Sequence, residues 1–505
     1  RMAIDAPVDR ALLRICPDGE QRFLEMAPAS PQDIDRSVCQ WMTARLRLEM
    51  PITGYRFLIM VGGEALWFTA AGLQRHWVTD ADDFRLLAGY RSPAWTHATV
   101  FYQIFPDRFA DGDSSNNVKT GEFIYRGRES KARRWGEPPS QGWDAMVEFY
   151  GGDLAGIGDK LPYLADLGVN ALYLNPIFTA YSNHRYDVTD YDHVDPHLGG
   201  NAALVELRRK TAELDFRLIL DIVPNHCGIL HPWFQMAQQD ENAPTADFFS
   251  FSHHPDQYEA WMGVPTLPRL DYHSARLRAV MYAGPESIFR HWLRSPYALD
   301  GWRIDVANML GRQGADQLDV EVGQGIRRAV KEENPEAYLL GENFFDASRH
   351  LQGDMWDAAM NYAGFSKPLW FWLSGFAVSQ HGGPSAAGPQ RWPTAALVES
   401  WQAYRAAIPW QIAVQQFNLL GSHDTERILS RLNGNPDLNR LAVGLQMTYP
   451  GVPCVYYGDE VGLTNQNNSN RVTMPWDAGD WDQGLRSFYQ KLIELRRTSP
   501  ALIAG

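Results

Sequence analysis

Cysteine is scarce in this chain. The four cysteines are Cys16, Cys39, Cys227 and Cys454. Their wide spacing fits neither a zinc site nor a dense disulfide framework. No apolar run approaches the roughly 18 residues of a membrane-spanning helix, and the first residues lack the apolar core of a signal peptide. We therefore predict a cytoplasmic protein without a membrane partner, although a chain that begins with Arg1 can have lost an upstream segment.

Positive charge is also in deficit. Lys and Arg number 46 against 60 Asp and Glu, which gives a formal net charge of −14. No basic stripe stands out that could neutralise phosphates, and this argues against a nucleic-acid partner. Aromatic residues are abundant instead, with 18 Trp, 21 Tyr and 23 Phe. Most of them must be core, but flat rings also suit a sugar-binding cleft, and composition alone leaves both interpretations open.

The pattern of the sequence changes near residue 98. Residues 1–95 consist of short alternating stretches punctuated by Gly and Pro, which predict an N-terminal antiparallel β-sandwich. Beyond them, strand-like runs alternate with amphipathic stretches, which predicts an α/β fold, a (β/α)₈ TIM barrel. The eight predicted strands are Val100–Phe105, Ala171–Asn175, Arg217–Val223, Gly301–Val306, Tyr338–Glu342, Ala358–Asn361, Phe417–Leu420 and Val452–Tyr457.

The predicted barrel is interrupted after its third strand. Residues 227–271 are rich in His, Pro and polar residues and predict a small inserted lobe. Residues 96–226 and 272–505 are then the two parts of the barrel. Residues 381–389, rich in Gly and Pro, predict a mobile loop.

Charged residues gather at the C-terminal ends of the predicted strands, where barrels of this kind carry their chemistry. Arg303 and Asp305 alternate on an apolar strand, so their side chains point the same way. An arginine beside an aspartate favours the ionised aspartate. The other strand ends supply Asp221, His226, Glu342, His423 and Asp424. A buried structural ion pair is the alternative, but this convergence favours a carboxylate-based active site.

Three carboxylates in one cleft fit the cleavage of a glycosidic bond. One acid must protonate the leaving oxygen, and a second carboxylate must attack the anomeric carbon or activate water. We assign Asp305 as the nucleophile, Glu342 as the proton donor with a raised pKa, and Asp424 as the group that grips sugar hydroxyls and steadies positive charge. His226 and His423 can donate hydrogen bonds to the same sugar. A metal hydrolase is the weaker alternative, because the motif His-Glu-x-x-His is absent and carboxylates outnumber histidines.

Four segments in chain order resemble the four motifs of the α-amylase family of glycoside hydrolases. They are Asp221–His226, Gly301–Asp305, Gly341–Asn343 and Ser422–Asp424. The resemblance runs from about residue 98 to the end of the chain. It implies the same three catalytic roles, action on α-glucosidic bonds, and retention of configuration through a covalent β-glycosyl intermediate. Asp305 and Glu342 should then lie about 5–5.5 Å apart. We place Asp221 and Arg303 among the substrate-binding residues.

Further segments resemble the neopullulanase, cyclomaltodextrinase and maltogenic amylase group of that family. They are His184–Asp187, Leu267–Asp271, Tyr456–Glu460 and Met474–Trp476. By this match Tyr186 stacks under the sugar that precedes the cleaved bond. One departure is Asn343–Asp346, where the group often has a Trp-His pair and where this chain is more similar to maltodextrin glucosidases.

We therefore expect hydrolysis of α-1,4 bonds in short maltodextrins with release of glucose. The alternatives within the enzyme class are a cyclomaltodextrinase or neopullulanase and an α-glucan transglycosylase. The alternative from another class is a non-catalytic sugar-binding relative. That alternative predicts the loss of a catalytic carboxylate, whereas all three are present here.

The resemblance also concerns both ends of the chain. Residues 1–95 would correspond to a sugar-binding-like sandwich that often dimerises in relatives, so a homodimer through this lobe is expected. Family members usually carry a C-terminal β-sandwich after the barrel. This sequence ends soon after the last predicted barrel helix, so we expect that domain to be absent or the chain to be incomplete.

One loop has the composition of a calcium site. Residues 111–117, Asp-Gly-Asp-Ser-Ser-Asn-Asn, concentrate the oxygen ligands that Ca²⁺ prefers, although a polar turn is the simpler explanation. Related enzymes hold a structural Ca²⁺ with such a loop and a Gly-Gly-Asp segment, matched here by residues 151–153. The resemblance thus implies these ligands: Asp111, Asp113, Asn116, Asn117, Gly151 and Asp153.

Overall fold

Eight parallel strands close into a barrel in the computed structural model, which describes residues 2–4, 8–29, 40–375 and 390–503. The hydrogen-bonded order is β25-β24-β21-β18-β15-β10-β27-β26, and a bridge between Met360 and Phe417 closes the ring. The strands are β10 (Phe101–Ile104), β15 (Ala171–Leu174), β18 (Arg217–Ile222), β21 (Gly301–Ile304), β24 (Tyr338–Gly341), β25 (Ala358–Ala359), β26 (Phe417–Leu419) and β27 (Val452–Tyr456). Each lies within a predicted strand, which confirms the predicted barrel.

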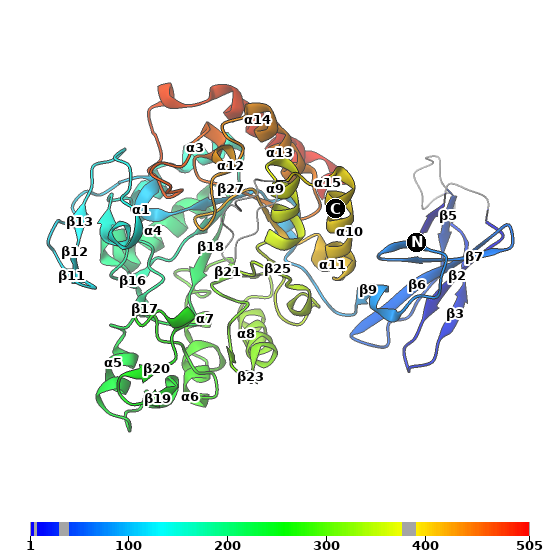
Figure 1. The fold of residues 1–505 in the computed structure, drawn as a ribbon, viewed down its shortest axis with the longest axis horizontal. Helices are drawn as coiled ribbons and strands as arrows, with labels where there is room; N and C mark the ends of the chain where they lie inside the picture. Colours follow the sequence, from blue (N-terminus) through cyan, green and yellow to red (C-terminus); the bar gives the residue numbers. More distant parts are fainter. Residues whose placement is uncertain (1, 5–7, 30–39, 376–389, 504–505) are drawn as a thin grey trace.

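Helices surround the strands and cover the outer face of the barrel (Figure 1). Parallel strands buried on both faces need this cover, and β15, β21 and β24 are buried along their whole length. The longer helices are α4 (Gly200–Glu213), α8 (Asp319–Glu333), α10 (Thr394–Ala406), α13 (Pro436–Thr448) and α14 (Gln483–Thr498). Shorter ones include α2 (Leu154–Asp159), α3 (Leu161–Leu167), α9 (Lys367–Leu373) and α11 (Trp410–Ala413).

The connection from β18 to β21 forms a projection at one side of the barrel, drawn in green in Figure 1. It contains α5 (Pro232–Gln239), β19 (Phe251–His253), β20 (Gln257–Tyr258), α6 (Ala275–Arg278) and α7 (Ile288–His291). The first three of these elements fall in the segment for which the sequence predicts an inserted lobe.

The N-terminal residues form two antiparallel sheets that share one apolar cluster. One sheet has the order β3-β2-β6-β7-β8, with β9 also paired to β6, and the other has the order β1-β5-β4. Their strands are β1 (Met2–Ile4), β2 (Arg10–Ile15), β3 (Arg22–Glu25), β4 (Ala27–Pro28), β5 (Gln40–Thr43), β6 (Ile52–Val61), β7 (Glu64–Thr69), β8 (Gly72–Gln74) and β9 (Phe84–Leu87).

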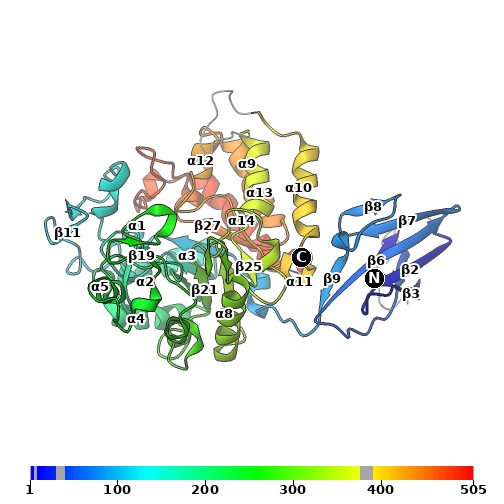
Figure 2. The same cartoon turned by 60° about the horizontal axis from the view of Figure 1, so that its bottom comes forward.

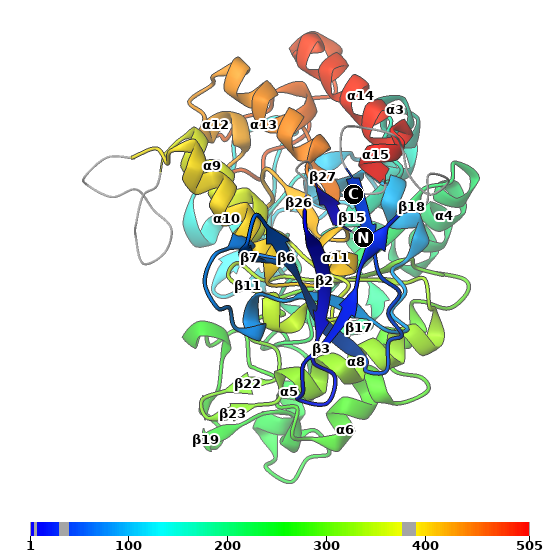
Figure 3. The same ribbon diagram turned by 90° about the vertical axis from the view of Figure 1, so that its right-hand side faces the viewer.

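This N-terminal lobe lies beside the barrel, against the end of α10 and the start of α11 (Figures 2 and 3). Arg85 donates to the Ala407 carbonyl at 2.5 Å. Leu87 and Gln411 exchange two hydrogen bonds, at 3.0 and 3.2 Å. Gln402 of α10 donates to the carbonyl of Ala71 at 3.0 Å, so the lobe is joined to the barrel by polar contacts as well as by the chain.

Within the described ranges, no helix combines the length and the apolar character needed to cross a bilayer. The mobile loop predicted over residues 381–389 lies outside the described residues.

A glycine is required where β21 begins. A Cβ on Gly301 would lie 2.2 Å from the carbonyl oxygen of Tyr338 on the adjacent strand, and the φ angle of Gly301 is +153°. The neighbouring atom is backbone and cannot move aside without disturbing the ladder that carries Arg303. The close approach of two barrel strands therefore depends on the absence of a side chain at this position.

We predict that Gly301→Ala lowers the free energy of unfolding by about 1–3 kcal/mol, because the added methyl overpacks the barrel. Chemical denaturation of the purified variant measures this change. Gly444→Ala is the matched control, since Gly444 lies in α13 with open space around it, and it should be neutral or stabilising by about 0.5–1 kcal/mol. Equal stabilities for wild type and Gly301→Ala would contradict the prediction.

Candidate active site

The predicted site residues meet at the C-terminal ends of the barrel strands. Asp221 lies on β18 and Arg303 on β21, whereas Asp305 and Glu342 directly follow the ends of β21 and β24. The other members come from the connections that follow β16 (Phe178–Ala180), β18 and β26, and they are Tyr186, His226, His423 and Asp424. The structure therefore brings together side chains separated by more than 200 positions in the sequence, as the predicted barrel requires.

The guanidinium of Arg303 is the centre of this arrangement. It is fully buried, and its Nη1 atom lies 2.8 Å from Asp221 Oδ1 and 2.7 Å from Asp305 Oδ1. Its Nη2 atom lies 3.0 Å from Glu342 Oε1, although without hydrogen-bond alignment. A buried cation is tolerated only when paired, and here one positive charge faces three carboxylates.

The backbone after Asp305 is turned toward Glu342. The Val306 N–H donates to Glu342 Oε2 at 2.7 Å, and Val306 has a φ of +47°. A β-branched residue rarely adopts a positive φ, because its side chain crowds the backbone, so surrounding contacts must hold it there. Strain of this kind is concentrated at functional sites, and here it positions the amide that contacts Glu342.

Asp305 and Glu342 influence each other's ionisation. Burial raises the pKa of Asp305 well above its usual range, Glu342 raises it further, and Arg303 opposes both. Burial likewise raises the pKa of Glu342; Arg303 opposes this, and Asp424 adds to it. The raised pKa predicted for Glu342 agrees with the structure. Arg303 favours the ionised form of Asp305 as expected, but burial and the charge of Glu342 oppose it.

Asp424 has the opposite tendency. Burial by itself would raise its pKa, but His423, Arg471 and Arg303 together lower it below the usual range. His423 Nε2 lies 3.0 Å from Asp424 Oδ2, and Arg471 Nη2 lies 3.0 Å from Oδ1. Asp424 is therefore an anion at neutral pH, as a group that stabilises positive charge must be.

The ring of His423 is held in one tautomer. The side-chain amides of Gln103 and Asn175 donate to Nδ1 at 2.8 and 3.0 Å, which leaves the proton on Nε2. Nε2 also contacts the Tyr186 hydroxyl at 2.6 Å, and the rings of His423 and Tyr186 stack with an interplanar angle of 11°. The Tyr186 ring is thus fixed at the site in an orientation set by His423.

Asp221 is a support for the others. It is completely buried and accepts hydrogen bonds at 2.8 Å from the hydroxyls of Tyr173 and Tyr186, in addition to its contacts with Arg303. Its contacts in the structure therefore position Arg303 and Tyr186, two of the residues that the sequence placed around the substrate.

His226 has a ring nitrogen without a hydrogen-bond partner, and the neighbouring ring of Trp261 has another. Its Nε2 is buried with no hydrogen-bond partner among the described residues, and the same is true of Nε1 of Trp261 in the projection. The two rings lie 5.6 Å apart. Buried N–H groups seldom remain unpaired, so this corner can donate to hydroxyls of a bound ligand.

Sequence reasoning missed Tyr173, Trp261 and Arg471. Arg471 stands three residues before the Met474–Trp476 motif, which is the only signal that pointed to it. Tyr173 lies inside a predicted barrel strand, where an inward tyrosine is not distinguishable by sequence from an ordinary core residue. Trp261 belongs to the projection between β18 and β21, whose packing the sequence does not specify.

The predicted calcium ligands are close together but engaged in different ways. Asp153 caps α2, accepting from the N–H groups of Gly112, Gly156 and Asp113 at 2.7–3.1 Å. The Asp153 carboxylate therefore accepts hydrogen bonds mainly from backbone N–H groups. The side-chain amide of Asn116 donates to it as well.

The asparagine oxygens of this loop are different. Oδ1 of Asn116 and of Asn117 are buried without a hydrogen-bond partner, and Asn117 donates to Asp111 at 2.8 Å. Gly151 lies directly against the Asn117 side chain. In the described part of the chain no three His, Cys, Asp or Glu side chains are arranged to hold a metal ion, so a cation here would depend on these amide oxygens.

The buried histidines lead to a prediction about acid stability. Burial lowers the pKa of His226 to about 3 and that of His423 to about 4, so both remain neutral in the folded protein. In the unfolded chain each takes up a proton near pH 6.5. Folding stability should therefore fall as the pH drops below about 6.5, since the unfolded state then binds more protons.

We predict that His226→Gln reduces this loss by up to about 1.4 kcal/mol per pH unit between pH 6.5 and 4. Chemical denaturation of wild type and variant across that range measures the difference. Comparing the two removes the contribution of the carboxylates, which is common to both proteins. Parallel curves of stability against pH would show that His226 is not held neutral.

Comparison with known proteins gives the same family. Residues 103–497 match the α-amylase catalytic domain. A cyclomaltodextrinase of Geobacillus thermopakistaniensis is 34% identical over 467 residues, covering 89% of this chain and 72% of that protein. An intracellular maltogenic amylase of Bacillus subtilis is 33% identical over 82% of this chain and 64% of its own length. The type III pullulan hydrolase of Thermococcus kodakarensis superposes with a TM-score of 0.75 at 27% identity, covering 98% of this chain and 84% of the other. The chain belongs to the α-amylase family of glycoside hydrolases.

Proposed function

We propose that the protein hydrolyses α-1,4-glucosidic bonds of maltodextrins and cyclodextrins with retention of configuration. The observation that supports this best is the contact of one buried arginine, Arg303, with Asp221, Asp305 and Glu342 at 2.7–3.0 Å. Both acids lie within 3.0 Å of one guanidinium, which supports a two-step displacement because that mechanism needs two carboxyl groups at the same bond.

In the first step, a carboxylate oxygen of Asp305 attacks the anomeric carbon while Glu342 donates its proton to the departing glycosidic oxygen. The products are a β-glycosyl ester on Asp305 and a shortened glucan. In the second step, Glu342 removes a proton from water, whose oxygen attacks the same carbon and releases Asp305. Glu342 must carry a proton, and Asp305 must be ionised, when the bond breaks.

Asp424 and Tyr186 support this sequence in different ways. Asp424 remains an anion and stabilises the positive charge that develops on the sugar ring. Tyr186, stacked on His423, offers a ring on which the sugar before the cleaved bond can pack. Loss of any of the three carboxylates would favour a non-catalytic sugar-binding protein, but all three are present and close together.

The relatives favour the cyclomaltodextrinase and neopullulanase alternative over release of glucose from short maltodextrins. Their names are cyclomaltodextrinase, maltogenic amylase and pullulan hydrolase. The Asn343–Asp346 segment, which suggested a maltodextrin glucosidase, is held by the stacking of Phe344 on Tyr362 at 4.2 Å and leaves Phe345 exposed. An exposed ring three positions after Glu342 is compatible with either specificity.

Two further expectations remain proposals. The intracellular maltogenic amylase of B. subtilis supports a cytoplasmic location. A homodimer through residues 1–95 stays a prediction from the resemblance.

We also propose a structural Ca²⁺ held by the 111–117 loop. The unpaired Oδ1 atoms of Asn116 and Asn117 support it, with Asp111, Asp113 and the Gly151 carbonyl as further ligands. Asp153 would be a weaker ligand, because it already caps α2. A cation here would fix the loop that follows β10 and take no part in the reaction.

Leaving-group chemistry separates the roles of the two reacting acids. Fluoride leaves an α-glycosyl fluoride with little protonation, whereas the glycosidic oxygen of a maltodextrin must be protonated before it leaves. We expect Glu342→Gln to lose about 10²–10⁴-fold activity on maltotriose but far less on α-maltosyl fluoride. Asp305→Asn should lose both activities, because no nucleophile remains, while still binding maltotriose. Equal losses of Glu342→Gln on both substrates would contradict its role as the acid.

A product analysis tests the substrate. Wild type is incubated separately with γ-cyclodextrin, pullulan and maltotriose, and the released sugars are identified by chromatography. We expect ring opening of γ-cyclodextrin and panose from pullulan. Glucose from maltotriose with no action on the other two would instead establish the maltodextrin glucosidase alternative. Longer glucans from maltotriose would indicate transglycosylation.

Calcium removal should lower thermal stability without an immediate loss of turnover. We expect a chelator to reduce the unfolding midpoint and added Ca²⁺ to restore it. Asn117→Ala should show a low midpoint that neither treatment changes. A midpoint insensitive to chelator in the wild type would exclude the site, and instant loss of hydrolysis would point to a catalytic metal instead.

A further inference from the structure

The segment that follows β25 lies between the two segments that carry Glu342 and Asp424. β25 pairs with β24, which ends directly before Glu342, and the bridge from Met360 to Phe417 joins it to β26 on its other side. Asp424 lies in the connection that follows β26. A side chain from this intermediate segment can therefore contact both of its neighbours.

Tyr362 makes such contacts on both sides and is completely buried. Its ring stacks on Phe344, two residues after Glu342, with ring centroids 4.2 Å apart and an interplanar angle of 7°. Its hydroxyl lies 2.7 Å from Oγ of Ser422, and that oxygen accepts the N–H of Asp424 at 3.2 Å. Tyr362 therefore connects the segment after Glu342 to the backbone amide of Asp424.

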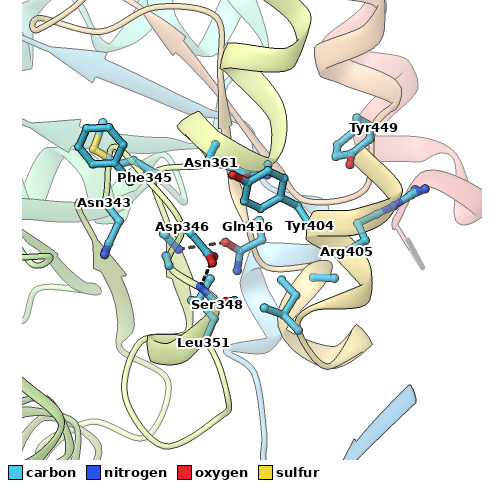
Figure 4. Close-up of a pocket in the computed structure, with 17 residues that line it drawn as sticks. Asn343, Phe345, Asp346, Ser348, Leu351, Asn361, Tyr404, Arg405, Gln416 and Tyr449 are labelled. Atoms are coloured by element: carbon cyan, nitrogen blue, oxygen red, sulfur yellow. Dashed lines mark hydrogen bonds between the residues drawn. The ribbon is translucent and has the colours of Figure 1, made fainter. Parts of the chain in front are cut away.

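The stacked pair is held by further contacts from both segments. Lys367, at the start of α9, donates to the carbonyl of Phe344. Asn343, directly before Phe344, and Asn361, directly before Tyr362, line the same small pocket (Figure 4). The ring of Phe344 is therefore fixed against Tyr362 by its own backbone as well as by stacking.

The hydroxyl of Tyr362 has a task that the ring alone cannot perform. A phenylalanine would stack on Phe344 in the same way, and a buried hydroxyl costs free energy unless it is hydrogen-bonded. Ser422 supplies that bond. Burial raises the pKa of Tyr362 well above its ordinary value, and the negative charges of Asp424 and Glu342 raise it further, so the hydroxyl stays neutral.

Asp424 depends on support from several directions, because its carboxylate must meet the sugar ring in one place. His423 and Arg471 contact its two carboxylate oxygens, each at 3.0 Å. These contacts orient the side chain, whereas the hydrogen bond from its N–H to Ser422 fixes the main chain. A displacement of about 1 Å at a reacting group can lower the rate by about 10²-fold.

We propose that Tyr362 is a positioning residue for Asp424. Its hydroxyl fixes the backbone of Asp424 through Ser422, and its ring holds this position relative to the segment that follows Glu342. The proposal rests on the proposed function, because that function gives Asp424 its role in stabilising positive charge.

Tyr362→Phe tests the proposal, because it keeps the ring and removes only the hydroxyl. We expect kcat to fall about 10–100-fold on maltotriose and by the same factor on α-maltosyl fluoride, since charge develops on the sugar ring with either leaving group. Ser422→Ala should cause the same fall, and combining the two substitutions should add nothing, because both break one path. Rates are expressed per chain that a 5-fluoro-α-glycosyl fluoride can label, so that inactive chains are not counted.

Tyr338→Phe is the matched control. Tyr338 is also completely buried, and its hydroxyl donates to the carbonyl of Gln415 at 2.5 Å. It lies at the start of β24, at the opposite end of the strand from Glu342. This variant should lose stability and keep wild-type rates on both substrates.

Each other outcome decides a separate point. Wild-type rates per labelled chain in Tyr362→Phe, with only fewer chains labelled, would show a merely structural role and overturn the proposal. A fall on maltotriose alone would show that the hydroxyl acts through Glu342 and would overturn the link to Asp424. If Tyr362→Phe does not fold, Ser422→Ala tests the same bond from its other end, and wild-type rates there would overturn the proposal. A wild type that cleaves neither substrate would instead overturn the proposed function.

Discussion

A single buried guanidinium holds the centre of this molecule together. Arg303 is cut off from water and can stay charged only because carboxylates surround it. Its contacts with Asp221, Asp305 and Glu342 connect three neighbouring barrel strands, β18, β21 and β24, at the ends where they meet. The pairing of these strands fixes the spacing of the charged groups. That pairing in turn requires the close approach of backbone at Gly301.

The same arrangement explains why neighbouring carboxylates differ. Burial and neighbouring carboxylates raise the pKa of both Asp305 and Glu342, and Arg303 opposes this rise. Asp424, a short distance along the strand ends, is stabilised as an anion by His423 and Arg471. Burial acts on all three, and the neighbouring charged and hydrogen-bonding groups decide the direction of each pKa shift. The proposed roles of proton donor, nucleophile and charge-stabilising anion therefore fit three similar side chains in different surroundings.

The sequence predicts the barrel well because buried parallel strands are apolar along their length. All eight runs contain a strand, and the carboxylates follow because their places are strand ends. The sequence could not predict the contacts of side chains whose partners come from distant segments. Arg471 reaches Asp424 from a loop 47 positions away, and Tyr173 reads as core although its hydroxyl holds Asp221. The resemblance likewise suggested Asp153 as a metal ligand but did not show that it also caps α2.

The most direct measurement of the central claim is to identify the residue that becomes glycosylated. A 5-fluoro-α-glycosyl fluoride slows the second step, so the intermediate accumulates and can be digested and located by mass spectrometry. The account predicts one added sugar on the peptide that contains Asp305, and none when Asp305 is replaced by Asn. A sugar found on Glu342 or Asp424, or turnover that inverts configuration without any adduct, would contradict it.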